Sequence, residues 1–256
     1  MPISASSLPS RRSLLLLAFV TLSSSLLAQE PAGTPARKDA LDAPPAGASD
    51  PLERVNRAVF GFNSGLTRFV FKPVSRGYEF VVPKPVRRGL DNIFDNVRFP
   101  VRFAGSLLQG KFQRATRETG KFAVNTVAGV GGLFKISDRI PAPAHQPAED
   151  MGQTLAVWRL PSGPYLVLPV LGPSTPRELL GRAGDSALTP TNWDQLKSGD
   201  DEWLTSDERA AIQAVEFVNA LPTVVRISDE MKAASLDPYV ATREAYLAHR
   251  AEEAGR

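Results

Sequence analysis

Residues 50–71, DPLERVNRAVFGFNSGLTRFVF, contain the strongest helix signal in the chain. Asp50 can cap free backbone amides, Pro51 suits the first position of a helix, and Glu53 can complete a capping box. The apolar residues are spaced alternately three and four apart, which places them in one continuous stripe: Leu52, Val55, Val59, Phe62, Leu66 and Phe69. The stretch therefore predicts an amphipathic helix.

Two asparagines lie within the apolar side of this predicted helix. At about 100° per residue, Asn56 and Asn63 fall one above the other, beside the stripe. A buried amide without partners costs a few kcal/mol, so both side chains need hydrogen-bonding partners. They either bond to a neighbouring segment or line a polar path through an otherwise apolar protein, and the sequence leaves both alternatives open.

The rest of the chain predicts short amphipathic helices interrupted by proline and glycine. Apolar residues recur at helical spacing over 86–97, 101–108, 112–130, 151–158, 175–183, 211–221, 224–234 and 237–247. We expect Pro73 and Pro222 to interrupt helices, and Thr175 to cap one. Residues 163–169, GPYLVLP, predict an extended segment rather than a sheet strand, because prolines suit a central strand poorly. The fold class is mostly α, and no stretch after residue 28 predicts a transmembrane span.

A glycine cluster follows the helix predicted over 112–130. Gly129, Gly131 and Gly132 do not follow a strand or precede a Lys-Ser/Thr pair, so a nucleotide site is not indicated. A hinge or a close backbone approach is the better interpretation. Gly152 ends the loop that the cluster begins, and an ordinary surface loop is the alternative to a hinged one.

The N-terminus predicts export. Arg11 and Arg12 precede an apolar run and small residues ending at Ala28, which is typical of a secretory signal over 1–28. Residues 29–49 are rich in Pro, Ala and Gly without periodicity, which predicts a disordered linker. Two of the 30 basic residues lie in the signal, against 27 acidic residues in the chain, so the mature protein is nearly neutral and nucleic acid is not an expected partner.

The residues that catalysis requires are scarce. The chain contains no cysteine, which excludes disulfides and thiolate metal sites, and only two histidines, His145 and His249. Neither histidine has metal-ligand spacing. The acidic pairs at 149–150 and 252–253 are interpreted as solvated charges rather than an acid/base pair. We therefore expect no catalysis, no cofactor and no metal.

Four groups of residues, far apart in the sequence, form an ordered set of motifs. The first is the start of the predicted helix, from Asp50 through Arg57 to Phe60 and Asn63. The second and third are Asn125-Thr126 with the glycine cluster, and GPY at 163–165 with Leu168-Pro169, Gly172-Pro173 and Arg177. The last is Asp237-Pro238-Tyr239 with Arg243 and Tyr246. In this order the motifs resemble the MlaA (VacJ) family of the bacterial outer-membrane lipid-asymmetry system, and the resemblance covers residues 50–248.

The resemblance implies a ring of amphipathic helices in the inner leaflet of the outer membrane, on its periplasmic side, around a polar channel. Phospholipid misplaced in the outer leaflet would pass through it to the periplasmic carrier MlaC, with a porin trimer as membrane partner. On that model the channel is lined by Asn56, Asn63 and Tyr165, whose polar tip suits a boundary between apolar and wet surfaces. Asn125 and Thr126 either join them or brace the hinge, and the gate hinges are Gly129, Gly131, Gly132 and Gly152.

The other residues that carry the resemblance are expected to be structural: Asp50, Pro51, Leu52, Glu53, Arg57, Gly163, Pro164, Arg177, Asp237, Pro238 and Tyr239. The implied helical domain is 50–250, followed by a solvated charged tail over 251–256. Relatives have a lipidated cysteine after the signal, where this sequence has Gln29, so we expect this chain to hold the membrane by other means. The alternative function is a soluble periplasmic lipid-binding or adaptor protein.

Overall fold

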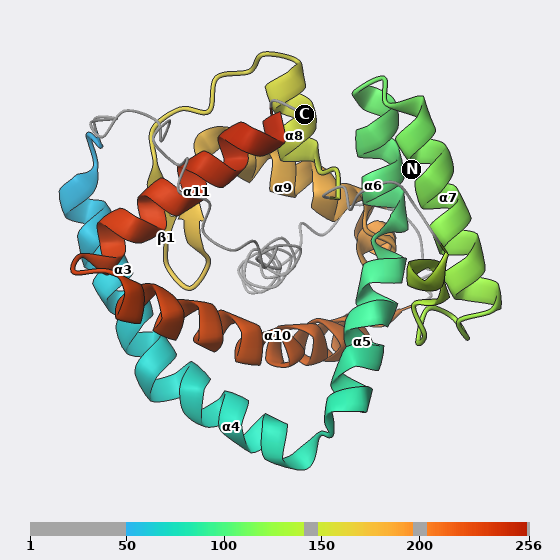
Figure 1. Ribbon diagram of the computed structural model, residues 1–256, viewed down its shortest axis with the longest axis horizontal. Helices are drawn as coiled ribbons and strands as arrows, with labels where there is room; N and C mark the ends of the chain where they lie inside the picture. The colour runs from blue at the N-terminus through green and yellow to red at the C-terminus, as the bar shows by residue number, and fades with distance from the viewer. Residues whose placement is uncertain (1–49, 141–147, 197–203, 255–256) are drawn as a thin grey trace, which may run out of the picture.

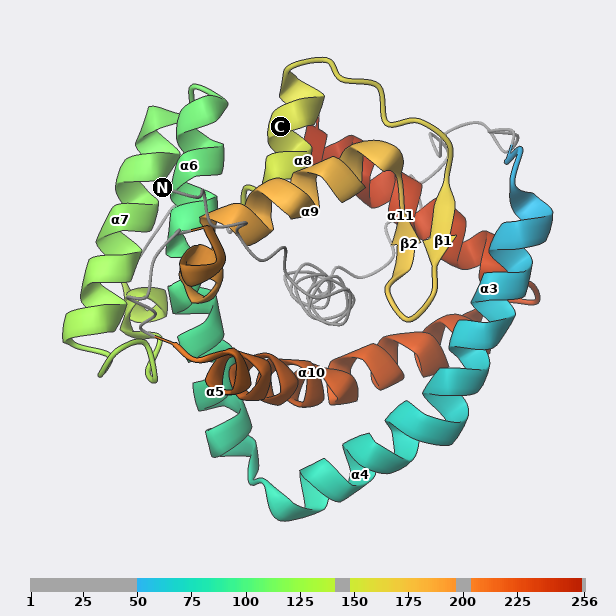
Figure 2. The same cartoon turned by 180° about the vertical axis from the view of Figure 1, so that it is seen from behind.

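A computed structural model describes residues 50–140, 148–196 and 204–254. The predicted signal, the linker and His145 lie outside the described residues. The described part is mostly α-helical, and its helices follow one another around the middle of the molecule in a ring (Figure 1; Figure 2). In chain order the first elements are α3 (Glu53–Leu66), η2 (Thr67–Phe71), α4 (Lys72–Val81), α5 (Lys84–Val97), α6 (Phe99–Leu108) and α7 (Phe112–Val127).

The second half of the chain completes this ring. The short 3₁₀ helix η3 (Ile136–Arg139) follows α7, and α8 (Met151–Val157) follows the undescribed residues 141–147. Two strands, β1 (Leu166–Leu168) and β2 (Gly172–Ser174), then precede α9 (Pro176–Leu188), η4 (Pro190–Leu196), α10 (Ser206–Ala234) and α11 (Pro238–Ala254). The last helix returns beside α8 and the hairpin, close to where α3 begins (Figure 1).

The prediction that Pro73 breaks the first helix is wrong. Helical structure is continuous from Glu53 to Val81 because α3 and α4 are joined by the π-helical η2. Within η2 the N–H of Lys72 bonds to the carbonyl of Thr67, five residues earlier. This wider turn gives the ring of Pro73 room that an α-helical turn would deny it. The wall of the ring therefore contains a long curved helix instead of two short ones.

The prediction that Pro222 interrupts a helix is also wrong, because α10 continues through it from Ser206 to Ala234. A capping box between Thr205 and Glu208 begins this helix, and Leu221 and Val225 pack against Phe71 and Phe217 on either side of the proline. These contacts offset the hydrogen bond that a proline removes. Alone among the described helices, α10 is long and apolar enough to cross a membrane by length and composition. It packs against α4, α5 and α11 as part of the helical assembly.

The extended segment predicted near 163–169 forms a sheet after all. Strands β1 and β2 pair antiparallel in a hairpin, with Val167 opposite Pro173. The backbone N–H of Val167 bonds to a side chain of α3, not to β2, so the missing N–H of Pro173 costs the hairpin no hydrogen bond. The argument from proline therefore fails for a two-stranded sheet.

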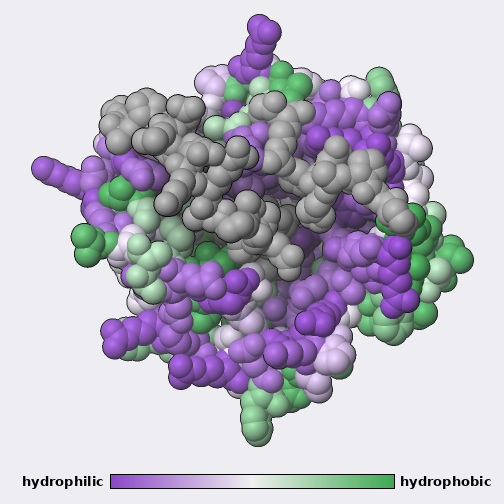
Figure 3. All heavy atoms as spheres, in the orientation of Figure 1, coloured by the Kyte–Doolittle hydropathy of each residue, from purple (hydrophilic) through white to green (hydrophobic). Residues whose placement is uncertain are grey.

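Apolar side chains collect on the outside of the ring. The predicted stripe on α3 and η2 is exposed at Val55, Phe62 and Phe69, of which Phe69 is 71% exposed. The space-filling view shows patches of apolar surface at the rim, over α3, the α4–α5 turn and the end of α7, with polar side chains between them (Figure 3). Within the described ranges, buried apolar residues form small clusters, such as Phe71 with Leu221 and Val225.

Candidate functional site

The amides of Asn56 and Asn63 hold the hairpin against α3. Asn56 Nδ2 donates to the carbonyl of Tyr165 at 2.9 Å, and its Oδ1 accepts from the N–H of Val167 at 2.9 Å. Asn63 repeats the pattern about two helical turns later, donating to the carbonyl of Leu168 at 2.8 Å and accepting from the N–H of Val170 at 2.7 Å. This geometry is that of the hydrogen-bonding alternative, and the channel-lining hypothesis for both residues stays a prediction.

Asp50 joins the first helix to the last one. The predicted cap and capping box are wrong, because α3 begins at Glu53 without a side-chain cap. The buried carboxylate of Asp50 instead accepts from Asn56 Nδ2 at 3.0 Å, from the N–H of Leu52 and from the hydroxyl of Tyr239. Burial, then this hydrogen bond, raise the pKa of Tyr239. Asp50 therefore links α3 to α11 through its side chain.

A second set of residues from the sequence motifs strengthens this junction. Arg57 donates to both carboxylate oxygens of Asp237, at 3.3 and 2.8 Å, and pairs with Glu53 one turn earlier at 2.7 Å. Its guanidinium also lies 4.4 Å from the ring centroid of Tyr239. Asp237 accepts from the N–H of Tyr239 and so begins α11, directly before Pro238. The motifs near the two ends of the domain thus meet in space.

Tyr165 is buried, whereas the sequence analysis placed it at a boundary between apolar and wet surfaces. It is 5% exposed and packs with Tyr239 and Tyr246, whose ring centroids lie 6.2 and 6.0 Å from its own. Burial raises the pKa of Tyr165 and raises that of Tyr246 to about 12. Both hydroxyls are buried without a hydrogen-bond partner within the described part of the chain. Gly163 and Pro164 lie in the connection just before this cluster.

Asn125 and Thr126 brace the turn that follows α7. Asn125 Oδ1 accepts from the N–H of Ser137 at 2.9 Å, and Thr126 Oγ1 accepts from Asn96 Nδ2 at 3.0 Å. Gly132 has a φ of 97°, and a Cβ there would lie 2.6 Å from the side chain of Asn96. The glycine cluster thus makes a close approach to α5, and a channel-lining role for Asn125 and Thr126 stays a prediction.

Gly152 occupies a different setting from the glycine cluster. It lies in the first turn of α8, where a Cβ would come 2.3 Å from Oε2 of Glu178, and α9 approaches it through Gly181. Close packing of α8 against α9 therefore requires a glycine here. The hinge role of Gly152, Gly129, Gly131 and Gly132 is not tested by this geometry and stays a prediction.

The acidic pair at 149–150 is buried and paired, so its interpretation as solvated charge is wrong. Glu149 is 4% exposed and accepts from Lys111 at 2.9 Å and from Arg114. Asp150 caps α8 by accepting from the N–H of Gln153 at 2.6 Å, and it pairs with Arg250 at 2.9 Å. Asp followed three residues later by Gln is an N-cap signature that identifies this role in the sequence.

The predicted charged tail continues α11 to Ala254, and part of it is buried. Arg250 reaches Glu178, Asp150 and Glu253, and the side chain of Glu253 is only 9% exposed. Arg177 pairs with Glu178 at 3.4 Å and donates to the carbonyl of Leu160. Glu178 is 1% exposed, so its neutralisation by cations from two helices is a condition of folding. Groups of three or more metal-ligating residues do not occur among the described residues.

Comparison with known proteins gives concordant matches. The family model described as MlaA lipoprotein matches residues 48–253. The intermembrane phospholipid transport system lipoprotein MlaA of Haemophilus influenzae is 30% identical over 77% of this chain and 76% of its own length. Its namesake from Escherichia coli K12 is 30% identical over 78% and 76%. A solved structure described as "Structural basis for maintenance of bacterial outer membrane lipid asymmetry" matches with TM-score 0.65 and 29% identity, over 80% of this chain and 99% of that one.

Asn56→Ala tests the attachment of the hairpin. The substitution leaves the N–H of Val167 and the carbonyl of Tyr165 without their partner, so we expect unfolding in detergent to become easier by about 2–5 kcal/mol. Asn92→Ala, which removes a single bond to the carbonyl of Leu133, is the matched control and should cost about 1 kcal/mol. Equal costs for the two variants would contradict the account of α3.

Asp185→Asn tests the buried charge cluster of α8 and α9. Burial, then the nearby Asp150, raise the pKa of Asp185 to about 7, while the N–H of Met151, Arg182 and Arg98 oppose the shift. A carboxyl group whose pKa is higher in the folded than in the unfolded state lowers the free energy of unfolding as the pH rises from about 4 to 7, because folding then requires it to stay protonated or to be buried with its charge. The variant should therefore gain stability relative to the wild type over that range, by roughly 2–4 kcal/mol. A pH-independent difference in denaturant unfolding would contradict this assignment.

Proposed function

The chain belongs to the MlaA family, and from that premise we propose that it is the outer-membrane component of an intermembrane phospholipid transport system. In this role it takes misplaced phospholipid from the outer leaflet through a polar path and passes it to the soluble periplasmic carrier MlaC. A porin trimer is its partner in the membrane. The names of the relatives from Haemophilus influenzae and Escherichia coli support the transport system, and the geometry supports residence in a membrane.

The observation that carries this proposal is the apolar outer surface of the helical ring. Soluble monomers rarely expose large contiguous apolar surface. Here exposed apolar residues follow one another along α3, η2, α4 and the start of α5, namely Val55, Phe62, Phe69, Val74, Phe80, Val81 and Val86. A further group surrounds the end of α7, namely Val127, Val130 and Phe134 (Figure 3). Acyl chains would cover these side chains in the inner leaflet, as for other interfacial amphipathic helices.

The inner side of the same helices is polar, which suits the passage of a headgroup. Moving a charged headgroup through hydrocarbon is costly unless polar groups replace its water. The charged residues that line the cleft between α4 and α10, and the buried Glu178 and Arg182 of α9, supply such groups away from the apolar rim. In this proposal the polar path runs through the ring and includes Asn56, Asn63 and Tyr165, with Asn125 and Thr126 beside it. The segment between Gly129 and Gly152 is its gate.

Phe62→Asp combined with Phe69→Asp tests the proposal directly. Two carboxylates on the outer face would have to enter hydrocarbon, so we expect the protein to leave the outer membrane on carbonate washing and to lose co-purifying phospholipid and porin. The control exchanges two exposed arginines, Arg54→Asp and Arg117→Asp, which leave the apolar stripe intact.

The tagged variants are expressed in cells that lack their own member of the family. We measure which envelope fraction contains each variant, and whether the variant restores outer-membrane lipid asymmetry. Restoration by wild type and control, but not by the double Phe variant, is the expected result. A wild-type protein that is recovered in the soluble periplasm without phospholipid or porin would contradict the proposal and favour the soluble adaptor.

A further inference from the structure

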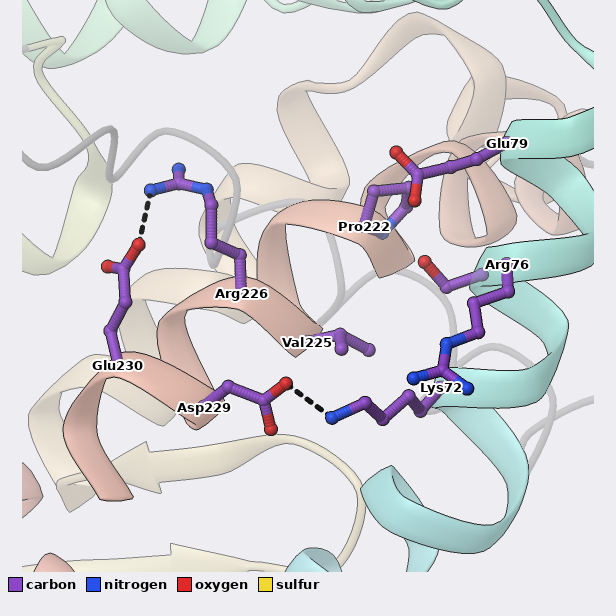
Figure 4. A pocket seen from close by; sticks show the side chains of 9 residues that line it. Lys72, Arg76, Glu79, Pro222, Val225, Arg226, Asp229 and Glu230 are labelled. Carbon is purple, nitrogen blue, oxygen red and sulfur yellow. Dashed lines mark hydrogen bonds and ion pairs between the residues drawn. The ribbon is translucent and has the colours of Figure 1, made fainter. Parts of the chain in front are cut away.

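A charged cleft separates α4 from α10 on the inner side of the ring wall. Its volume is about 370 Å³, which is within the size range of small-ligand sites. Figure 4 shows side chains from α4 on one side and from α10 on the other, with Val225 and Pro222 between them. The cleft thus combines apolar residues with charged groups of both signs.

The cleft lies on the side of α4 opposite the apolar surface. Lys72, Arg76 and Glu79 are three or four residues apart and share the face that lines the cleft. Val74 and Val81 lie on the opposite face and are exposed. One helix therefore separates the surface proposed to contact acyl chains from a site that holds charges, so a bound amphiphile at this helix can meet both environments within a short distance.

The carboxylates of the cleft already have cationic partners. Asp229 accepts from Lys72 at 2.6 Å, and Glu230 from Arg226 at 3.1 Å (Figure 4). Glu79 pairs at 2.6 Å with Arg87, which comes from α5 and does not line the cleft. Arg76 forms no ion pair with any described residue, although its charge contributes to lowering the pKa of Asp229. The lining has three cations and three carboxylates, and one positive charge is left over because Arg87 neutralises Glu79 from outside the cleft.

Arg76 is therefore the group that awaits an anion. In Figure 4 its guanidinium lies over the carbon stem of Lys72, whose ammonium group points to Asp229. Arg76 is thus the cation of α4 that is left to attract a negatively charged ligand. A guanidinium matches the oxygens of a phosphate with two parallel hydrogen bonds. The excess of one charge matches a phosphodiester, which carries a single negative charge, while Pro222 and Val225 offer apolar contact to the carbons next to it.

We propose that the cleft between α4 and α10 binds the phosphodiester of a phospholipid headgroup, with Arg76 as its principal contact and Lys72 beside it. This inference rests on the proposed function, because it assigns a headgroup site to the transported lipid. The headgroup would then bind on the inner side of α4, and the outer side of the same helix would face acyl chains.

Native mass spectrometry of the full chain in non-ionic detergent tests this site. The protein is titrated with dioleoyl phosphatidylethanolamine, with dioleoylglycerol, which has the same chains without phosphate, and with inorganic phosphate. Arg76→Gln should weaken binding of the phospholipid about tenfold, the loss expected for a charge-assisted hydrogen bond. Arg76→Lys should retain part of the affinity, and Arg54→Gln, an exposed arginine on α3, should change nothing. Binding of dioleoylglycerol should be the same in all four proteins.

Each other outcome overturns the inference in a recognisable way. Equal phospholipid binding by wild type and Arg76→Gln would remove the cleft as a headgroup site and leave the proposed function standing. Inorganic phosphate binding at Arg76 as tightly as the lipid would identify a site for the free ion instead. A wild-type protein that binds no phospholipid at all would contradict both the cleft and the proposed function.

Discussion

Two asparagine side chains on α3 occupy the place of a third strand, and the arrangement of the ring depends on them. Asn56 and Asn63 satisfy backbone groups of the hairpin that would otherwise be buried without partners. The hairpin in turn contributes Tyr165 and Val167 to a cluster with Tyr239 of α11. Asp50 and Arg57 bond to the same end of α11, so the first and last helices are held to one another and to the hairpin. Polar tethers of this kind close the ring without a large apolar core.

The absence of a large core explains where the apolar residues of the described chain go. A helix of a soluble domain turns its apolar stripe inward, whereas Val55, Phe62 and Phe69 of the stripe on α3 and η2 are exposed. The asparagines of α3 face the hairpin instead. Several charges on the inner side are paired, either in the buried cluster of Glu178 and Arg250 or across the cleft between α4 and α10, where Lys72 bonds to Asp229 and Arg76 forms no ion pair with a described residue. An apolar exterior with a polar interior suits a membrane interface, as the proposed function requires.

The helices were largely predictable from sequence, because periodicity is local, but among the caps only that of Thr175 was predicted correctly. Thr175 caps α9 and the helix after Asp150 begins as expected. The wrong predictions concern residues whose behaviour depends on distant partners. Pro73 is accommodated by a π-helical turn, and Pro222 by contacts of α10 with Phe71. Glu149 and Glu253 look like solvated charges until their partners from other helices are known. For Asn56 the sequence identified the need for partners, but only the fold identifies the hairpin.

Solvent accessibility of spin labels in a bilayer tests the central claim, that the α3–α4 wall faces acyl chains on one side and polar groups on the other. Because the chain has no cysteine, single nitroxides can be placed by Phe62→Cys on the outer face and Arg226→Cys in the cleft. Molecular oxygen concentrates in hydrocarbon and a neutral nickel chelate stays in water. The account predicts that the label at 62 responds to oxygen and not to nickel, and that the label at 226 responds to nickel. Equal responses to nickel at both positions would contradict it.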